Sequence, residues 1–500
     1  MNELVPKPAY RVQSNLPTSS VAFLSLLIFL LVFVSVLVGQ AVSHSSLLND
    51  PDTYWHVATG RVIWETGSLP QRDQFSWTFE GQRWIAKEWF SQLMLFGAYH
   101  LASWRGVILI TAGAIAFAYA LLFAVLSRQM RITVAAGIVM VALILASRHF
   151  LARPHVFSFP LVVLWVTGLV RAVEERRTPN WLLLPVMILW ANVHAGFTLG
   201  LAIAGGLAAE AVFSSERKER IGVAIRWAIF LGAALAAGCL TPYGYEPLLT
   251  TYKLYQGQPV EQIIEWSPLN AKREPMVELL LLCLLFLSLY FGVKIRFWRL
   301  ILTIGIIHLM FLHVRMVALF GLITPILITS TLVNQFRFLR LDTQIMDDPA
   351  LFRVVQRFSG FLAYLVVCSF ILIAAAVYGS REDTSPKKEY TPTGAVDYIQ
   401  QKNLAGNIYN TYEFGGYLIF RGVKTFIDGR IDQLFLGGFM ERIARAQLDG
   451  SFPEILKQYD ISLALVAPNS PEVWQLEKLP GWTKAYSDDI SALFIRNPSP

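Results

Sequence analysis

The stretch Asp50-Pro51-Asp52-Thr53-Tyr54-Trp55-His56 follows directly on the first apolar part of the chain, segment 21–41. That segment is long enough to span a membrane as a retained helix. The stretch after it brings two carboxylates and an imidazole to the membrane boundary, where ionisable groups cost free energy and usually have a function. It therefore predicts a membrane-spanning chain with a reactive site at the start of its first outer loop.

The composition agrees with a polytopic membrane protein. Of the 500 residues, 55% are hydrophobic and only 15% are charged, which is too apolar for an ordinary soluble enzyme. The formal net charge is +7. In a membrane protein this excess indicates basic cytoplasmic loops rather than a nucleic-acid partner.

Apolar segments predict about eleven transmembrane helices. They are 21–41, 105–127, 132–147, 155–171, 180–194, 196–213, 222–240, 277–293, 298–313, 315–333 and 359–378. If the N-terminus is cytoplasmic, every inner loop is basic, as the positive-inside rule requires. The basic residues of these loops are Arg128, Arg131, Arg171, Arg176, Arg177, Arg217, Lys218, Arg220, Lys294, Arg296, Arg299, Arg337, Arg340, Arg353 and Arg357.

The chain is expected to form two domains. Residues 1–380 are predicted to be the transmembrane domain, with a first external loop at 43–104, and residues 381–500 a soluble α/β domain on the outer side. The segment 381–389 has the composition of a linker. Within the tail, the pattern predicts a helix around 396–401 and strands at 407–409, 417–420, 461–466 and 492–496.

The first outer loop is predicted to begin with a short helix at 51–66. Asp50 can cap this helix, Pro51 suits its first turn, and Gly67 marks its end. Capping is an ordinary structural role, so Asp50 is the second candidate for catalysis. Asp52 and His56 are four residues apart and share one helix face, where they can converge on a proton or a metal ion, or only bind each other.

Two further features follow in the same loop. Segments 75–79 and 82–84 flank Glu80-Gly81, which predicts a tight hairpin lying over the membrane surface. Glu88 then opens another helix. It is either a favourable charge at a helix N-terminus or another carboxylate that faces the site.

Three outer corners where apolar spans meet carry cationic, imidazole or amide groups. Arginine grips phosphate oxygens in pairs, and histidine adds a hydrogen bond or a proton, so these corners are candidate phosphate sites. A single such residue would more often reach past the apolar spans to the interface, but several on one side indicate a common site. The candidates are Arg148, Arg153, His155, Asn192, His194, His313 and Arg315.

These groups suit transfer from a lipid phosphate donor. A carboxylate deprotonates an acceptor hydroxyl, while arginines or a divalent cation stabilise the departing phosphate. A likeness to a known family rests on the outer tail and on the motifs 50–56, Ala58-Thr59-Gly60-Arg61, Glu88-Trp89 and 190–196. In these features the chain resembles the GT-C glycosyltransferase superfamily, which includes protein mannosyltransferases, aminoarabinose transferases and oligosaccharyltransferases. It resembles in particular bacterial multi-spanning proteins of that type.

The resemblance implies a polyprenyl-phosphate-linked sugar donor and transfer at the outer face of a bacterial inner membrane to a glycan, lipid or protein acceptor. It implies a base or metal-ligand role for Asp52, with Asp50 second, and a periplasmic C-terminal domain. A Mg or Mn ion would be held by Asp52 and His56. The chain lacks the Asp-Glu dipeptide in the first loop and the Trp-Trp-Asp motif of better-known members.

The sequence is also compatible with two other classes of function. A transporter or lipid flippase would carry charges near the bilayer midplane, whereas the charges here lie mostly at span ends. A non-catalytic envelope assembly protein would depend on its tail and not on Asp52. In the tail, stretches 412–417 and 426–432 are turn formers first, although both could face an acceptor.

Overall fold

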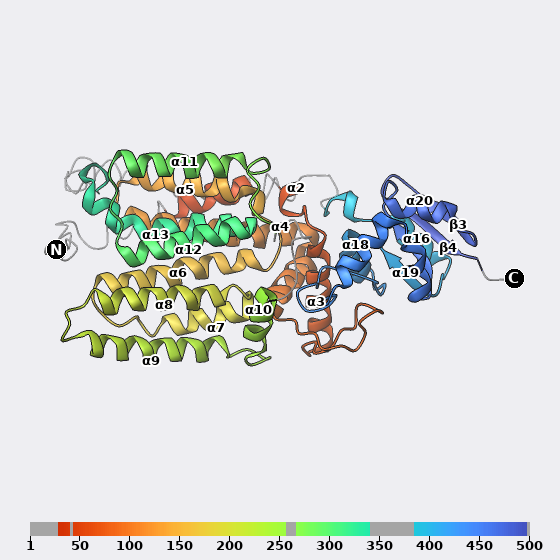
Figure 1. Ribbon diagram of the computed structural model, residues 1–500, viewed down its shortest axis with the longest axis horizontal. Helices are drawn as coiled ribbons and strands as arrows, with labels where there is room; N and C mark the ends of the chain where they lie inside the picture. The colour runs from red at the N-terminus through yellow and green to blue at the C-terminus, as the bar shows by residue number, and fades with distance from the viewer. Residues whose placement is uncertain (1–28, 41–43, 257–266, 341–384, 498–500) are drawn as a thin grey trace.

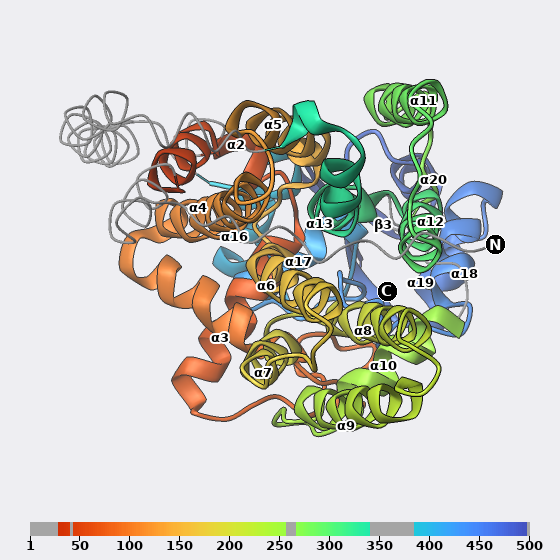
Figure 2. The ribbon, with the colours of Figure 1, turned by 90° about the vertical axis from the view of Figure 1, so that its left-hand side faces the viewer.

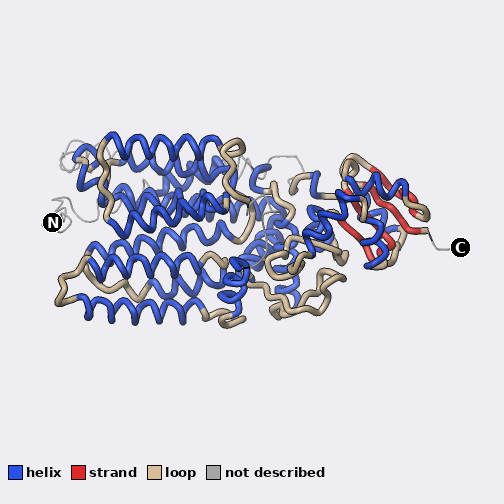
Figure 3. Tube along the Cα trace, in the orientation of Figure 1, coloured by secondary structure: helices blue, strands red, loops and turns tan. Residues whose placement is uncertain are grey.

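The computed structural model describes residues 29–40, 44–256, 267–340 and 385–497. It is elongated, with a bundle of helices towards the N-terminal end and a small α/β region at the C-terminal end (Figure 1). The strands gather in that C-terminal region (Figure 3). Helix α3 and the loop after it lie between the two parts.

Five of the described helical segments are long and apolar enough to cross a membrane. They are α4 (Trp89–Ser127), Ile132–His149 (α5, Ile132–Ala146, with η1, Ser147–His149), α6 (His155–Glu174), α9 (Arg220–Gly238) and Val314–Gln335 (η4, Val314–Met316, with α13, Val317–Gln335). Shorter apolar helices are Phe29–Gln40, α7 (Leu183–Val193), α8 (Phe197–Phe213), α11 (Pro275–Tyr290) and α12 (Phe297–Leu312). The prediction of about eleven spans is thus confirmed for five, and the span at 359–378 lies outside the described residues.

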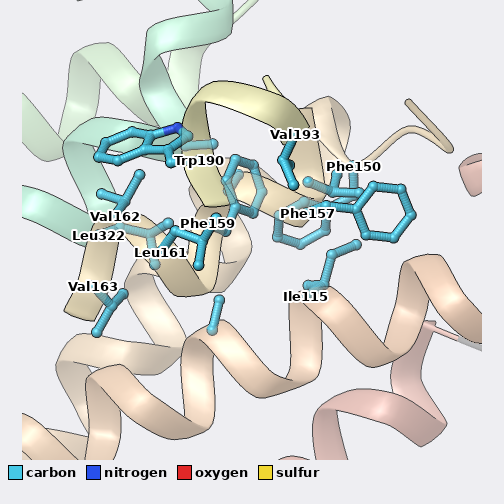
Figure 4. Close-up of a cluster of buried hydrophobic side chains, with 14 of the residues drawn as sticks. Ile115, Phe150, Phe157, Phe159, Leu161, Val162, Val163, Trp190, Val193 and Leu322 are labelled. Atoms are coloured by element: carbon cyan, nitrogen blue, oxygen red, sulfur yellow. The ribbon is translucent and has the colours of Figure 1, made fainter. Parts of the chain in front are cut away.

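Helix α6 lies at the centre of the bundle, against α4, α7, α8 and α13. Figure 4 shows its buried Phe157 and Phe159 in one cluster with Ile115 of α4 and Trp190 of α7. Helices in lipid associate through close packing rather than a hydrophobic driving force. Gly200 of α8 illustrates this, because an added Cβ would lie 3.0 Å or less from atoms of the Trp190 ring.

Helix α3 and the first part of helix α4 frame the first outer loop. Helix α3 (Asp52–Thr66) follows α2 (His44–Leu47) and ends at Gly67, whose φ of +62° is a left-handed cap. Helix α4 begins after Glu88, and its path breaks at Ala102 and Ser103, where φ of Ser103 is +52°. The break separates an outer arm, 89–101, from the membrane-crossing part. The predicted starts of both helices are confirmed.

The predicted hairpin is wrong in its register. Strand-like pairing joins 71–73 to 82–84, with the Asp73 N–H donating to the Gln82 carbonyl at 2.8 Å. Segment 75–79 instead pairs with the tail, where the N–H of Trp77 donates to the carbonyl of Thr425 at 3.0 Å. The reason is packing, because Phe79 lies against tail rings such as Phe435.

The tail forms a four-stranded sheet in the order β1-β2-β4-β3, with β1 and β2 parallel and the other pairs antiparallel. Its strands are β1 (Asn407–Asn410), β2 (Ile461–Val466), β3 (Trp482–Ser487) and β4 (Ala492–Arg496). Its helices are α16 (Thr393–Gln401), α17 (Gly415–Phe420), α18 (Phe439–Asp449), α19 (Phe452–Gln458) and α20 (Pro471–Lys478). The remaining short elements are α10 (Glu246–Gln256), η5 (Arg337–Leu339), η6 (Lys388–Tyr390) and η7 (Tyr412–Phe414).

Three predicted strands and the helix around 396–401 are confirmed, but the strand at 417–420 is wrong. That segment is helix α17, which packs on α3. Gly416 allows the contact, because an added Cβ would overlap the carbonyl of Pro51. Strand β3 escaped detection because most of its side chains are partly or fully exposed.

Candidate active site

Arg153 ties together the two carboxylates at the start of α3. Its Nη2 lies 2.7 Å from Asp50 Oδ1 and 2.7 Å from Asp52 Oδ2. Asp50 Oδ1 also accepts the backbone N–H of Asp52 at 2.8 Å, as a residue at a helix start does. The side chain of Asp50 is 2% exposed and that of Asp52 is 10% exposed. Asp50 therefore positions the turn, and Asp52 keeps some access to the site.

The tail closes over Asp52 through Gly429. A Cβ added to Gly429 would lie 2.6 Å from Cγ of Asp52 and 2.8 Å from Nε1 of Trp55. This Nε1 is buried and has no hydrogen-bond partner among the described residues. A buried N–H group without a hydrogen-bond partner costs free energy. Trp55 is therefore a candidate to donate a hydrogen bond to a substrate.

Glu88 and His194 form a second acid and base pair nearby. His194 Nδ1 accepts the N–H of Gly196 at 3.0 Å, so the neutral ring carries its proton on Nε2, which lies 3.4 Å from Glu88 Oε1. Burial raises the pKa of Glu88 to about 7, although the positive charge of Lys87 opposes the shift. Burial, followed by the charge of Arg315, lowers the pKa of His194. Glu88 can thus hold or release a proton near neutral pH.

His56 lies on the same face of α3 as Asp52, but neither is the other's closest polar neighbour. His56 Nδ1 lies 3.3 Å from Nε2 of Gln92 in the outer arm of α4. Burial, and then the charge of Arg153, lowers the pKa of His56. The neutral imidazole is therefore part of the wall behind Asp52.

The other predicted phosphate-binding residues divide into two groups. The positive charge of Arg315 acts on both Glu88 and His194, and the rings of His155 and His194 are 6.3 Å apart. His313 lies in the same corner as Arg315, between α12 and α13. Arg148 contacts another loop, because its Nη1 donates to the Arg273 carbonyl at 2.8 Å and its side chain is 66% exposed.

Asn192 is held within the frame of the site. Its Oδ1 accepts the Nε1–H of Trp89 at 2.8 Å. Its Nδ2 donates to the carbonyls of Ile188 and Leu240, at 2.8 and 3.0 Å. These bonds fix the ends of α7 and α4 against each other, so Asn192 positions the neighbouring His194.

Two ion-paired clusters in this region escaped the sequence analysis. Lys87 pairs with Asp432 of the tail. Arg430 is fully buried between Asp73 of the first loop, at 2.5 Å, and Asp428 of the tail, at 2.7 Å. The stretch 426–432 is therefore more than a turn, because its charges join the tail to the first outer loop. The sequence feature that indicated this role is the close spacing of Asp428, Arg430 and Asp432 among apolar residues.

The two residues predicted to hold a metal ion both have other polar neighbours. Arg153 pairs with the carboxylate of Asp52, and Gln92 faces Nδ1 of His56. In residues 29–40, 44–256, 267–340 and 385–497, no three side chains of the types His, Cys, Asp or Glu are grouped so that they could hold a metal ion.

Comparison with known proteins gives a structural likeness alone. No family model and no curated protein sequence matches the chain. Among solved structures, the chain is similar to the apo form of an oligosaccharyltransferase from Archaeoglobus fulgidus, with a TM-score of 0.50 and 11% identity. The match covers 89% of this chain and 69% of the other. The fold is therefore similar to that of this oligosaccharyltransferase.

Proposed function

We propose that the protein is a membrane glycosyltransferase that moves a sugar from a polyprenyl-phosphate-linked donor to an acceptor hydroxyl. The convergence of Asp52, Glu88, His194 and Arg315 between one end of the bundle and the tail is the observation that carries this proposal. It combines carboxylates for proton transfer with a cation for a phosphate. The fold likeness supports the same class.

In the proposed reaction, Asp52 is the general base. Its carboxylate takes the proton of the acceptor hydroxyl while the acceptor oxygen bonds to C1 of the sugar. The bond between C1 and the phosphate oxygen breaks, and its electron pair stays with the phosphate. The backbone of Gly429 and the ring of Trp55 lie beside Asp52, so they would confine the acceptor there.

The departing phosphate is assigned to the side of the site that holds Arg315, His194 and Glu88. Arg315 supplies positive charge. Glu88, with its pKa raised to about 7, can give its proton to a phosphate, whose second pKa is about 6. The proton from the acceptor thus ends on Asp52, and the phosphate receives one from Glu88.

The transporter alternative would require charges in the middle of the spans. The buried cluster of Arg299 with Glu210, at 3.0 Å, and Glu174, at 3.0 Å, is the strongest case. Arg299 lies near the start of α12, whereas Glu210 and Glu174 lie at the ends of α8 and α6. This cluster therefore joins helix ends, away from the centre of the bilayer.

We assign the site to the outer side of the membrane. The site and the tail lie at the same end of the bundle (Figure 1), opposite the loops that carry most of the basic residues. By the positive-inside rule, the site would face the periplasm of a bacterial inner membrane.

Purified protein should cleave polyprenyl-phosphate-linked hexoses, which is measured as release of free polyprenyl phosphate in the presence of candidate acceptors. In liposomes, a flippase would instead move the donor across the bilayer intact. Translocation without bond cleavage, over a panel of glucose, galactose and mannose donors, would contradict the proposal.

A further inference from the structure

A pocket of about 250 Å³ lies on the opposite side of α3 from Asp52 and His56. Its lining includes Arg61 of α3, His100 and Ser103 of α4, and Phe420 of the tail. Arg61 lies nine residues after Asp52, which is half a turn away around the helix axis at 3.6 residues per turn. The pocket is therefore separate from the candidate active site.

Arg61 is held in place by a backbone group and an aromatic ring. Its Nη2 donates to the carbonyl of Phe420 at 2.6 Å, and its guanidinium lies 5.3 Å from the centre of that ring. Among the described residues, no carboxylate forms an ion pair with Arg61. The pocket thus keeps an uncompensated positive charge with donors left for an anion.

The pocket lies at the break in α4, a helix long and apolar enough to cross a membrane. Ser103 marks the break between the outer arm of α4 and its membrane-crossing part. Beside it, Trp64 is 60% exposed and Leu101 is 86% exposed. Figure 2 shows α3 at the edge of the molecule, beside the bundle. Exposed tryptophan and leucine beside such a break are typical of side chains that contact lipid at the membrane interface.

We propose that this pocket binds the phosphate headgroup of an anionic phospholipid of the surrounding bilayer. Arg61 contacts the phosphate, and Trp64 and Leu101 lie against the first part of the acyl chains. Its volume is below the range of roughly 300–1,000 Å³ that drug-sized ligands occupy, which suits a small headgroup better than a phosphate with a sugar. This proposal does not depend on the reaction assigned to Asp52.

The bound lipid would steady a junction that the active site uses. Arg61 joins α3 to Phe420 at the end of α17, and α17 packs on the first turn of α3 through Gly416 and Pro51. An occupied pocket would hold Arg61 in this contact. The lipid therefore acts through position and is not a reactant.

The test is native mass spectrometry of the full-length protein in detergent, titrated with phosphatidylglycerol, phosphatidylcholine or polyprenyl monophosphate. Ser103 provides a matched pair of variants, because Asn and Asp have nearly the same size and shape and differ mainly in charge, so both meet the same backbone at φ +52° and ψ −148°. Ser103→Asp should weaken phosphatidylglycerol binding about fivefold or more, while Ser103→Asn keeps it within about twofold.

Arg61→Gln should weaken the binding of phosphatidylglycerol as much as Ser103→Asp does. Arg72→Gln is the control, because exposed Arg72 of the same loop also donates to a carbonyl, that of Gly81 at 2.7 Å. Melting temperatures near the wild-type value show that the variants are folded. Three results would each overturn the proposal. The two Ser103 variants could bind phosphatidylglycerol equally, or the protein could bind phosphatidylglycerol and phosphatidylcholine equally. The third result is that the Ser103 variants differ only in their binding of polyprenyl monophosphate.

Discussion

Gly429 of the tail lies against Asp52 of the first outer loop, so closely that an added Cβ would be 2.6 Å from Cγ of the carboxylate. The two residues are far apart in the sequence and belong to different parts of the fold. Their contact makes the tail one wall of the candidate active site. The tail thus limits the space around Asp52.

Gly429→Ala tests this contact. The new methyl group has to displace Asp52, Trp55 or the tail backbone, so turnover is expected to fall about tenfold or more, because small displacements of reacting groups are costly. Gly97→Ala is the control, since nothing lies within 4 Å of a Cβ at Gly97. Sugar release is measured for both. Wild-type turnover by Gly429→Ala would show that the tail does not confine Asp52.

Arg430 is expected to be the main ionic link between the tail and the first loop. Arg430→Met leaves Asp73 and Asp428 buried without their cation, which should cost about 3–5 kcal/mol in the stability of the junction. Arg496→Met removes an exposed pair with Asp460 and should cost at most about 1 kcal/mol. Thermal unfolding and limited proteolysis of the tail measure the difference. Similar behaviour of the two variants would refute the link.

The pH dependence of turnover is expected to follow Glu88. Burial raises the pKa of Glu88 to about 7, so the protonated acid predominates below this pH and is lost as the pH rises above it. If Glu88 protonates the departing phosphate, turnover falls on the alkaline side. Glu88→Gln should turn over slowly and lose this limb, whereas Glu454→Gln, an exposed change in α19, should keep it. An unchanged alkaline limb in Glu88→Gln would assign the titration to another group.

Asp50 is predicted to matter less than Asp52. Asp50→Asn retains an oxygen that can accept the N–H of Asp52, so the start of α3 should remain intact. The variant loses the negative charge that pairs with Arg153, so Arg153 would form its ion pair with Asp52 only. Turnover should fall by about tenfold at most, with KM little changed. A loss as large as that of Asp52→Asn would make Asp50 an equal partner in the reaction.

Sequence patterns within a single short segment were enough to predict some parts of the site. Helix α3 follows from Asp50, Pro51 and Gly67, and the polar corners of Arg153 and His194 follow from where apolar segments end. The contacts of Gly429 could not be predicted in this way. They depend on how the tail meets α3, and a single sequence carries no record of such long-range contacts.

The same reason explains the wrong hairpin. The aromatic segment 75–79 has the composition of an interfacial hairpin, but its partner is Thr425 in the tail. Likewise, 417–420 alternates like a strand and forms a helix, because Gly415 and Gly416 let that segment lie against the first turn of α3 and the backbone at Asp428. In both cases packing between distant segments overrode the local preference.

The proposed role of Asp52 is tested most directly by sugar release from a polyprenyl-phosphate-linked donor with Asp52→Asn and, as a matched control, Asp489→Asn, an exposed change between β3 and β4. Loss of a general base is expected to lower turnover about 10²–10⁴-fold in Asp52→Asn, with the control unchanged. Wild-type turnover by a folded Asp52→Asn protein would contradict the account.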